Sequence, residues 1–397
     1  MSKPSVTVFI GRLDLSGGRT VMLFKTVDIL IDAGFDVTVC AFWQPRPIWW
    51  PWFRTTYPLP KGAKYTHIFK PTLKDRKPFK PVHAAENNSA ERLEAFKAYC
   101  RTIETDAVIL PNFGHFIETA FLENVPSMVF TILSDHHSQR YDHVFGLTDL
   151  SEMDKHQSNF YGRAKDFDAL HLVNPAIEQK LTGIVPNILS IPNFIDDQPQ
   201  PDSSFLRSRK IIAGGRLVPE KGFEDLIRAF RAVARDHPDW TLEIYGKGPL
   251  RETLSKAIKE LSLEGKVQLL PPSREFKDKL AKAALHVSSS VTESYGLTLA
   301  EAMSFGVPVL SQHQHVGSDF LLSDGRGQYA SSSDLDDLAS VLDANMSQIE
   351  GGDPDGVLQS QVERAYTFVQ SVSYKNALEV WKTSILDGIA AKRAQLK

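Results

Sequence analysis

Short apolar runs alternate with amphipathic and glycine-containing stretches through the first half of the chain. Residues 6–10 form an apolar run, glycines follow at 17 and 18, apolar positions recur at helical spacing over 20–33, and residues 37–41 form a second run. A strand, a glycine turn, a helix and a strand in this order make the βαβ unit of a parallel sheet. The alternation predicts an α/β domain with a doubly wound sheet. Its further strands are expected at 107–110, 127–132, 169–173 and 188–191.

A second series of the same kind follows a polar stretch at 196–209, which has no periodicity and is typical of a linker. We therefore expect two Rossmann-like domains, residues 1–195 and 196–373, with a C-terminal helix over 374–397. Two such parallel sheets place a ligand crevice at the carboxyl ends of their strands. The second series has expected strands at 210–213, 241–245, 267–270, 286–288 and 307–311, and a helix at 223–236.

Composition narrows the class of protein. The 397 residues suffice for two cores, and 42% apolar with 23% charged residues is the balance of a folded, water-soluble chain. A net charge of −3 gives no global attraction to nucleic acid. Cys40 and Cys100 form no CxxC motif, which favours a reducing compartment and no zinc site. The apolar run at 6–10 is too short for a signal segment or a membrane span, so we expect a cytoplasmic protein.

The segment 292–309 combines a polar loop, a helix that begins near Leu297 and a glycine-proline stop before the next strand. Free backbone N–H groups from Gly296 to Thr298 and the positive end of the helix dipole suit a diphosphate. Gly296 carries no Cβ to obstruct that approach. Glu293 and Glu301 flank this place, and carboxylates beside a diphosphate are suited to accept hydrogen bonds from sugar hydroxyls. The segment predicts a site for a sugar linked to a diphosphate.

A second strand-to-helix loop, GGRLVPEKGF at 214–223, carries Arg216 and Lys221. The planar fork of arginine and the mobile charge of lysine suit two adjoining phosphates whose negative charge grows as a sugar leaves. Gly246 and Gly248 form a further turn, but the third glycine and the downstream acid of a dinucleotide fingerprint are missing. That absence disfavours an oxidoreductase.

The sequence ESYGLTLAEAMSFGVPV, with Glu293 and Glu301 separated by seven residues, resembles the signature of retaining glycosyltransferase family 4. The resemblance implies the GT-B fold, with parallel sheets facing across a cleft and the C-terminal helix packed back on the first domain. It implies transfer of a sugar from a nucleotide diphosphate with retention at the anomeric carbon. Arg216 and Lys221 would grip the diphosphate, Glu293 would orient the hexose and Glu301 the ribose. The donor set so implied is Gly17, Gly18, Arg216, Lys221, Gly246, Glu293, Tyr295, Gly296, Leu297, Thr298 and Glu301.

Two features of the first domain extend the resemblance. Gly17 and Gly18 are similar to the family's glycine turn near the donor phosphates or the acceptor, although a plain tight turn is the alternative. The segment ILSDHH ends a strand where the family places a histidine near the transferred sugar. Asp135, His136 and His137 are the candidates, and we favour His136. The predicted catalytic residues are thus Asp135, His136, Glu293, Arg216 and Lys221.

Residues 42–80 hold four of the six tryptophans and nine basic residues against one acid, with prolines that exclude a long helix. We expect an extended loop that acts as a sugar-stacking platform or as an anchor at the inner membrane face. The alternative is that its aromatics pack on the first domain and its lysines are a solvated face.

The function so indicated is hexose transfer from a nucleotide sugar, with UDP favoured, to a glycan, polyol-phosphate or lipid-linked acceptor in cell-surface polysaccharide or glycoconjugate synthesis. No metal and no cofactor are expected, because cationic side chains and a helix end supply the charge. Two alternatives stay open. One is a sugar-nucleotide epimerase or phosphorylase of the same fold, and the other is a non-catalytic carbohydrate- or membrane-binding module.

Overall fold

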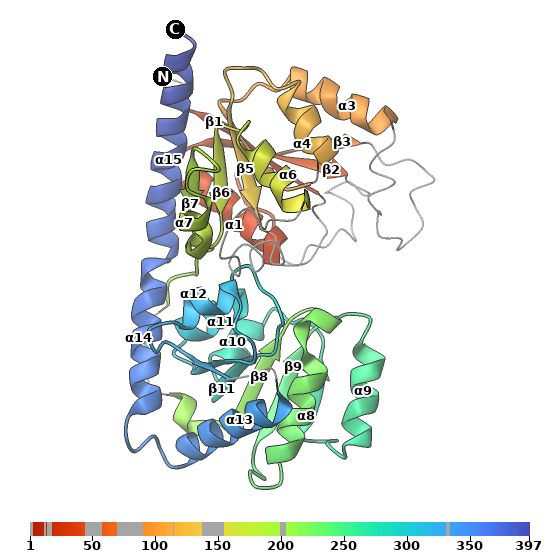
Figure 1. Ribbon diagram of the computed structural model, residues 1–397, viewed down its shortest axis with the longest axis vertical. Coiled ribbons are helices and arrows are strands. Elements are labelled where there is room, and N and C mark those ends of the chain that lie inside the picture. The colour runs from red at the N-terminus through yellow and green to blue at the C-terminus, as the bar shows by residue number, and fades with distance from the viewer. Residues whose placement is uncertain are drawn as a thin grey trace. The chain divides into compact units, whose positions relative to one another are not determined.

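The computed structural model describes residues 3–11, 13, 18–43, 58–69, 90–113, 115–136, 155–198, 204–330 and 334–397. These residues form two compact units (Figure 1). The first contains the described parts of 1–136, 155–192 and 375–397, and the second contains those of 193–374. Each unit is built on one parallel sheet, which confirms the predicted fold class of two α/β domains. Within the described ranges, no helix is both long and apolar enough to cross a bilayer.

The sheet of the first unit has the order β3-β2-β1-β4-β5-β6-β7, and every neighbouring pair is parallel. β1 is an inner strand and is almost fully buried, which explains its mainly apolar sequence. The strands are β1 (Ser5–Ile10), β2 (Asp36–Trp43), β3 (Lys64–Phe69), β4 (Ala107–Pro111), β5 (Phe130–Asp135), β6 (Ala169–Leu172) and β7 (Ile188–Ser190). The helices are α1 (Gly18–Asp32), α3 (Ala90–Arg101), α4 (His115–Leu122), α6 (Lys155–Ala164), η3 (Pro175–Ile177), α7 (Glu178–Leu181) and α15 (Tyr374–Gln395).

Part of the stretch 42–80 is regular structure, which corrects the expectation of one extended loop. β2 continues to Trp43, and β3 pairs with it in parallel from Thr38↔Lys64 onward. Phe42 is buried against the rings of Phe9, Phe96 and Phe113, so it belongs to the core. Trp49, Trp50, Trp52 and most of the basic residues of this stretch lie outside the described residues. The acceptor site expected from them therefore stays a prediction.

The C-terminal helix α15 belongs to the first unit, although the preceding chain belongs to the second. Trp381 of α15 is buried and its ring meets that of His171 on β6, with centroids 4.7 Å apart. Lys392 pairs with Asp168 at 2.6 Å, near the end of the helix. A buried aromatic contact and an ion pair at the far end fix α15 along this sheet.

The sheet of the second unit has the order β10-β9-β8-β11-β12-β13, again all parallel. Its strands are β8 (Lys210–Gly214), β9 (Thr241–Tyr245), β10 (Val267–Leu270), β11 (Leu285–Ser288), β12 (Val309–Ser311) and β13 (Gln328–Tyr329). Its helices are η4 (Ser204–Arg207), η5 (Pro219–Lys221), α8 (Phe223–Val233), α9 (Arg251–Glu260), α10 (Phe276–Leu280), α11 (Leu297–Ser304), α12 (Val316–Leu322), α13 (Leu335–Glu350) and α14 (Val357–Ser371).

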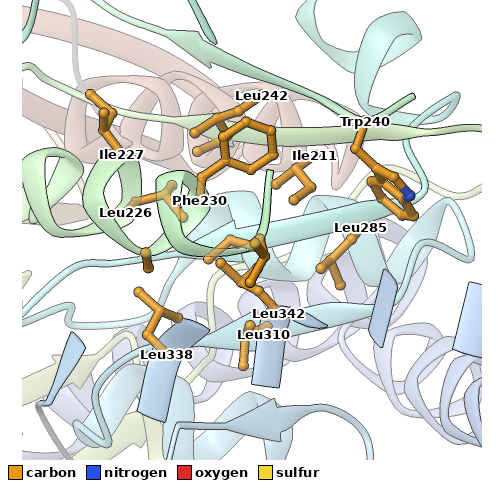
Figure 2. Close-up of a cluster of buried hydrophobic side chains, with 14 of the residues drawn as sticks. Ile211, Leu226, Ile227, Phe230, Trp240, Leu242, Leu285, Leu310, Leu338 and Leu342 are labelled. Atoms are coloured by element: carbon orange, nitrogen blue, oxygen red, sulfur yellow. The ribbon is translucent and has the colours of Figure 1, made fainter. Parts of the chain in front are cut away.

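Both faces of this second sheet are covered by apolar side chains. Ile211 of β8 enters the cluster formed with α8 and α13, whereas its neighbour Ile212 enters the cluster formed with α11 and α12. Figure 2 shows the first cluster, with Phe230 of α8 beside strand residues. Phe205 also lies in it and is buried, so the polar stretch at 196–209 is not wholly a linker. Within this stretch, Phe205 and Leu206 pack against the apolar cluster.

Candidate functional site

The loop between β8 and α8 is held by the loop that follows β11. The Ser289 hydroxyl donates to the carbonyl of Lys221 at 2.8 Å, and the Val291 N–H donates to the carbonyl of Glu220 at 2.9 Å. Gly222 lies between η5 and α8 with φ of 59°, and a Cβ there would meet the Ser289 carbonyl oxygen at 2.2 Å. Position 222 therefore requires glycine for two reasons, the left-handed backbone and the lack of space for a Cβ. Two predicted segments, far apart in sequence, are brought together by backbone contacts.

Lys221 and Glu293, both predicted site residues, form an ion pair between Nζ and Oε1. The Ser290 hydroxyl donates to the same carboxylate oxygen at 3.0 Å. The two side chains are 16% and 24% exposed, so the pair is shielded but open to a ligand. A lysine in this position can turn its charge from a carboxylate to an arriving phosphate.

Arg216 is placed differently from Lys221. Its side chain is exposed, and it makes no hydrogen bond or ion pair with any other residue that the structure describes. Gly246 lies against this loop, because a Cβ there would meet the Gly215 carbonyl oxygen at 2.1 Å, and Gly215 N–H donates to Tyr245. Gly246 thus has a clear structural use in supporting the loop that carries Arg216. Its predicted contact with the donor stays a prediction.

Helix α11 begins at Gly296, whose φ of 87° and ψ of 56° are left-handed, and no side chain caps the helix there. Gly296 has no side chain that could cap the first N–H groups of the helix, at Leu297 and Thr298, where the anion site is predicted. The turn directs the neighbouring Tyr295 inward, where its ring is 1% exposed and lies 5.8 Å from that of Phe320. Only the backbone of Tyr295 could therefore reach a ligand, and its predicted place in the donor set stays a prediction.

Glu301, on α11, is linked to a residue that sequence reasoning missed. Lys277 of α10 lies 3.5 Å from the Glu301 carboxylate and 2.7 Å from that of Asp196. Burial lowers the pKa of Lys277, but the two carboxylates outweigh it and the net shift is upward. Lys277 is therefore cationic and fixes the direction of Glu301. One lysine among several in KDKLAK gave no signal in the sequence.

His315 is a second residue that the sequence reading missed. Its Nδ1 accepts from the Ser318 N–H at 3.0 Å and caps α12, and the Ser318 hydroxyl oxygen accepts from the His315 N–H at 3.0 Å. Burial lowers the pKa of His315 to about 4, against the opposing effect of the nearby Glu293 carboxylate. A neutral histidine therefore stands beside the Lys221–Glu293 pair.

The predicted residues of the first unit lie at the end of β5. Asp135 is fully buried, and His136 follows it outside the strand. His136 Nε2 lies 3.0 Å from the Ser134 hydroxyl, which lies 2.7 Å from Nδ1 of His171. Burial, then His171 and then Arg19 of α1 hold the pKa of His136 well below its usual range. Gly18 begins α1 and is exposed, whereas Gly17 and His137 lie outside the described residues.

Within the ranges that the structure covers, no three His, Cys, Asp or Glu side chains are grouped closely enough to bind a metal ion. Cations already present, Lys221 and Lys277, lie beside the two glutamates. The second unit can therefore offer positive charge, helix N–H groups and hydroxyl-accepting carboxylates from protein groups alone.

Comparison with known families and proteins shows which proteins this chain is similar to. Residues 195–348 match the family model described as glycosyl transferases group 1. An exopolysaccharide phosphotransferase of Streptomyces coelicolor is 30% identical over 272 residues, which cover 67% of this chain and 27% of that protein. A poly(glycerol-phosphate) alpha-glucosyltransferase of Bacillus subtilis is 27% identical over 173 residues, 43% of this chain and 25% of that protein. The chain thus spans about a quarter of the length of these relatives.

A solved structure of a Staphylococcus aureus TarM variant, in complex with fondaparinux, alpha-GlcNAc-glycerol and UDP, superposes with a TM-score of 0.72 at 15% identity. The match covers 97% of this chain and 99% of that one. At this identity the likeness concerns the fold, and it shows that the chain has the GT-B fold. The segment with Lys221, Glu293 and Glu301 lies inside the region that matches the group 1 glycosyl transferases.

Proposed function

We propose that this chain is a retaining glycosyltransferase that moves a hexose from a nucleotide diphosphate sugar, most simply a UDP-sugar, to an acceptor hydroxyl. The observation that carries the proposal is the shielded Lys221–Glu293 ion pair, four residues before the uncapped start of α11. This arrangement provides a movable cation, two helix N–H groups and a carboxylate in one region of the second unit.

The proposed roles follow from charge. Lys221, exposed Arg216 and the α11 N–H groups bind the diphosphate and stabilise the charge that grows as the anomeric C–O bond breaks. Glu293 exchanges its bond to Lys221 for a hydroxyl of the hexose, and Glu301, held by Lys277, accepts from the ribose. The acceptor oxygen adds to the face that the diphosphate leaves, and its proton passes to the departing phosphate oxygen.

His136 is the proposed contact of the first unit with the transferred sugar. Asp135 is fully buried, so we assign it a supporting role at the end of β5 rather than a contact with substrate. UDP as the leaving group is supported by its presence in the TarM complex, and an α-linked product by the name of the Bacillus relative. An α-product from an α-linked donor is what retention predicts.

The acceptor class is proposed from the relatives and from the basic stretch 42–80. One relative is named for an exopolysaccharide and the other for poly(glycerol-phosphate), both surface polymers and the second an anionic one. Nine basic residues and one acid in this stretch suit such an acceptor or a lipid-linked one. We therefore propose action at the cytoplasmic face of the membrane, in the synthesis of a cell-surface polymer.

The test incubates the purified chain with UDP-, GDP- and ADP-sugars, with and without poly(glycerol-phosphate) or a lipid-linked glycan, and identifies the released nucleotide. Lys221→Met should lower kcat by about 10²–10³-fold, as loss of a charge-stabilising donor does. Lys256→Met is the matched control, because Lys256 forms an exposed pair with Glu260 on α9 and should keep wild-type activity.

The products separate the alternatives. UDP release together with transfer of the labelled sugar to the added acceptor supports the proposal. UMP release would mean transfer of a sugar phosphate, which the name of the Streptomyces relative makes worth testing. Acceptor-independent interconversion of sugars would indicate an epimerase, and binding without turnover would indicate a carbohydrate-binding module. Each of these three results would overturn the proposed function.

A further inference from the structure

A chain of hydrogen bonds leads from His136 into the core of the first unit. His136 Nε2 lies 3.0 Å from Oγ of Ser134, and that oxygen lies 2.7 Å from Nδ1 of His171. His171 Nε2 lies 2.9 Å from the carbonyl oxygen of Ile191. Ser134 and His171 are both buried, and they lie on the neighbouring strands β5 and β6. The proposed function uses only His136, so the two residues behind it remain to be explained.

Proton counting fixes the direction of every bond in this chain. A carbonyl oxygen can only accept, so Nε2 of His171 must carry a hydrogen. Burial lowers the pKa of His171 to about 4, and its ring is therefore neutral with a lone pair on Nδ1. The Ser134 hydroxyl has one hydrogen, which it must donate to that lone pair. The same oxygen can then only accept from His136, so His136 Nε2 carries a hydrogen.

We infer that Ser134 and His171 are positioning residues that hold His136 as the Nε2–H tautomer and leave its Nδ1 as an acceptor for a substrate hydroxyl. This inference rests on the proposed function for the identity of that substrate. A ring fixed in this way accepts from the hydroxyl of a sugar or acceptor and disfavours a carboxylate, which has no hydrogen to donate.

The surroundings of the ring keep it neutral and in place. The rings of His136 and His171 meet edge to face, with centroids 6.0 Å apart, and Trp381 of α15 packs on the other ring at 4.7 Å. Arg19 of α1 is the charged group that faces His136, and its cation opposes a second proton on the ring. The buried Asp135 interacts with Arg19 and so balances that cation.

The test records tautomer states in the purified full chain by nitrogen NMR with ¹⁵N-labelled histidine, at neutral pH and without substrate. The sequence has twelve histidines, and a His136→Asn spectrum identifies the signals of His136 by difference. We expect the Nε2–H tautomer in the wild type. A His136 ring that is cationic or is the Nδ1–H tautomer would overturn the inference.

Variants of His171 give opposite expectations. His171→Phe keeps a ring against Trp381 but removes the acceptor, so the Ser134 hydroxyl turns to His136 Nε2 and the tautomer should change to Nδ1–H. His171→Gln can donate to Ile191 and accept from Ser134, so it should keep the wild-type tautomer. An unchanged His136 signal in His171→Phe would refute the relay, because a merely structural role predicts no tautomer change.

Ser134→Ala is the independent variant should His171→Phe fail to fold. It leaves His136 Nε2 without its acceptor, and both tautomers should then be populated. With a working transfer assay, Ser134→Ala and His171→Phe should each lower kcat/KM about ten-fold, the effect of one hydrogen bond. His171→Gln should lower it less than about two-fold, because it keeps that bond. A correct tautomer with no transfer would refute the proposed function alone, whereas transfer with a wrong tautomer would refute this inference alone.

Discussion

Gly222→Ala tests whether the backbone contact at the start of α8 builds the site. Gly222 has a φ of 59°, and an alanine in the left-handed region costs about 1–2 kcal/mol. Its Cβ would also lie 2.2 Å from the carbonyl oxygen of Ser289, well inside van der Waals contact. Relieving that overlap needs a backbone shift of the kind that costs about 1–3 kcal/mol. We therefore expect a loss of about 2–5 kcal/mol in the free energy of unfolding.

Gly265→Ala is the matched control, because it separates the two contributions. Gly265 has a φ of 83°, and a Cβ there would meet nothing within 4 Å. It should lose only about 1–2 kcal/mol, the cost of the left-handed backbone. Urea unfolding followed by circular dichroism measures both variants, and the midpoints are compared at equal m-values. Equal losses in the two variants would refute the claim that the Ser289 contact is tight.

Gly222→Ala should also affect catalysis. A shift of the Ser289 carbonyl also moves the hydroxyl that binds the Lys221 carbonyl and displaces Ser290, which holds Glu293. We expect Gly222→Ala to lower kcat at least about ten-fold at a temperature where it is folded, because misplaced groups lose catalysis steeply. Gly265→Ala should keep wild-type kcat. Full activity in folded Gly222→Ala would show that the ion pair tolerates movement of its loop.

Two further predictions concern ionisable groups. Burial opposes protonation of His237, but bonds to Glu350 at 3.0 Å and Asp343 at 3.1 Å raise its pKa overall. A histidine whose pKa is raised by folding stabilises the protein at pH values below its unfolded pKa of about 6.5. That stabilisation is lost as the pH rises through the pKa of the folded state. From about pH 6 to 8 the free energy of unfolding of the wild type should thus fall by on the order of 1 kcal/mol relative to that of His237→Gln. Urea unfolding at each pH measures this, and the same pH dependence in both proteins would contradict it. Burial raises the pKa values of Cys40 and Cys100 to about 12 each. Ellman's reagent should therefore label neither thiol at about pH 8 until urea unfolds the protein. Rapid labelling of the native chain would refute the burial of these thiols.

The fold was predictable because a parallel sheet covered on both faces requires strands that are apolar throughout. β1, β4 and β8 have that sequence and were predicted within a residue or two. β3 was missed because its sequence, KYTHIF, mixes polar and aromatic residues at the edge of the sheet, where only partial burial is needed. β5 begins at Phe130 rather than Ser127, since the residues before it form a turn closed by Val129 N–H and Pro126.

The site was predictable only as far as local sequence defines it. The GGR loop and the two-glutamate segment were assigned to one ligand, yet the pairing of Lys221 with Glu293 spans 72 positions and depends on tertiary contacts. Tyr295 was predicted as a donor contact from its place beside Gly296, and the sequence did not indicate that packing buries its ring beside Phe320. Lys277 could not be found, since its meaning comes from the carboxylates that packing places around it.

Two buried histidines show why the remaining information is not in the sequence. His171 and His286 both lie within short strands, both have a pKa lowered by burial to about 4, and both bond a backbone carbonyl through one nitrogen. In the part of the chain that the structure describes, the second nitrogen of His286 has no hydrogen-bond partner, whereas that of His171 meets Ser134. His286 is therefore only a core residue. His171, through Ser134, determines which nitrogen of His136 carries the hydrogen. The role of such a histidine is therefore decided by what its other nitrogen touches, which the strand pattern does not specify.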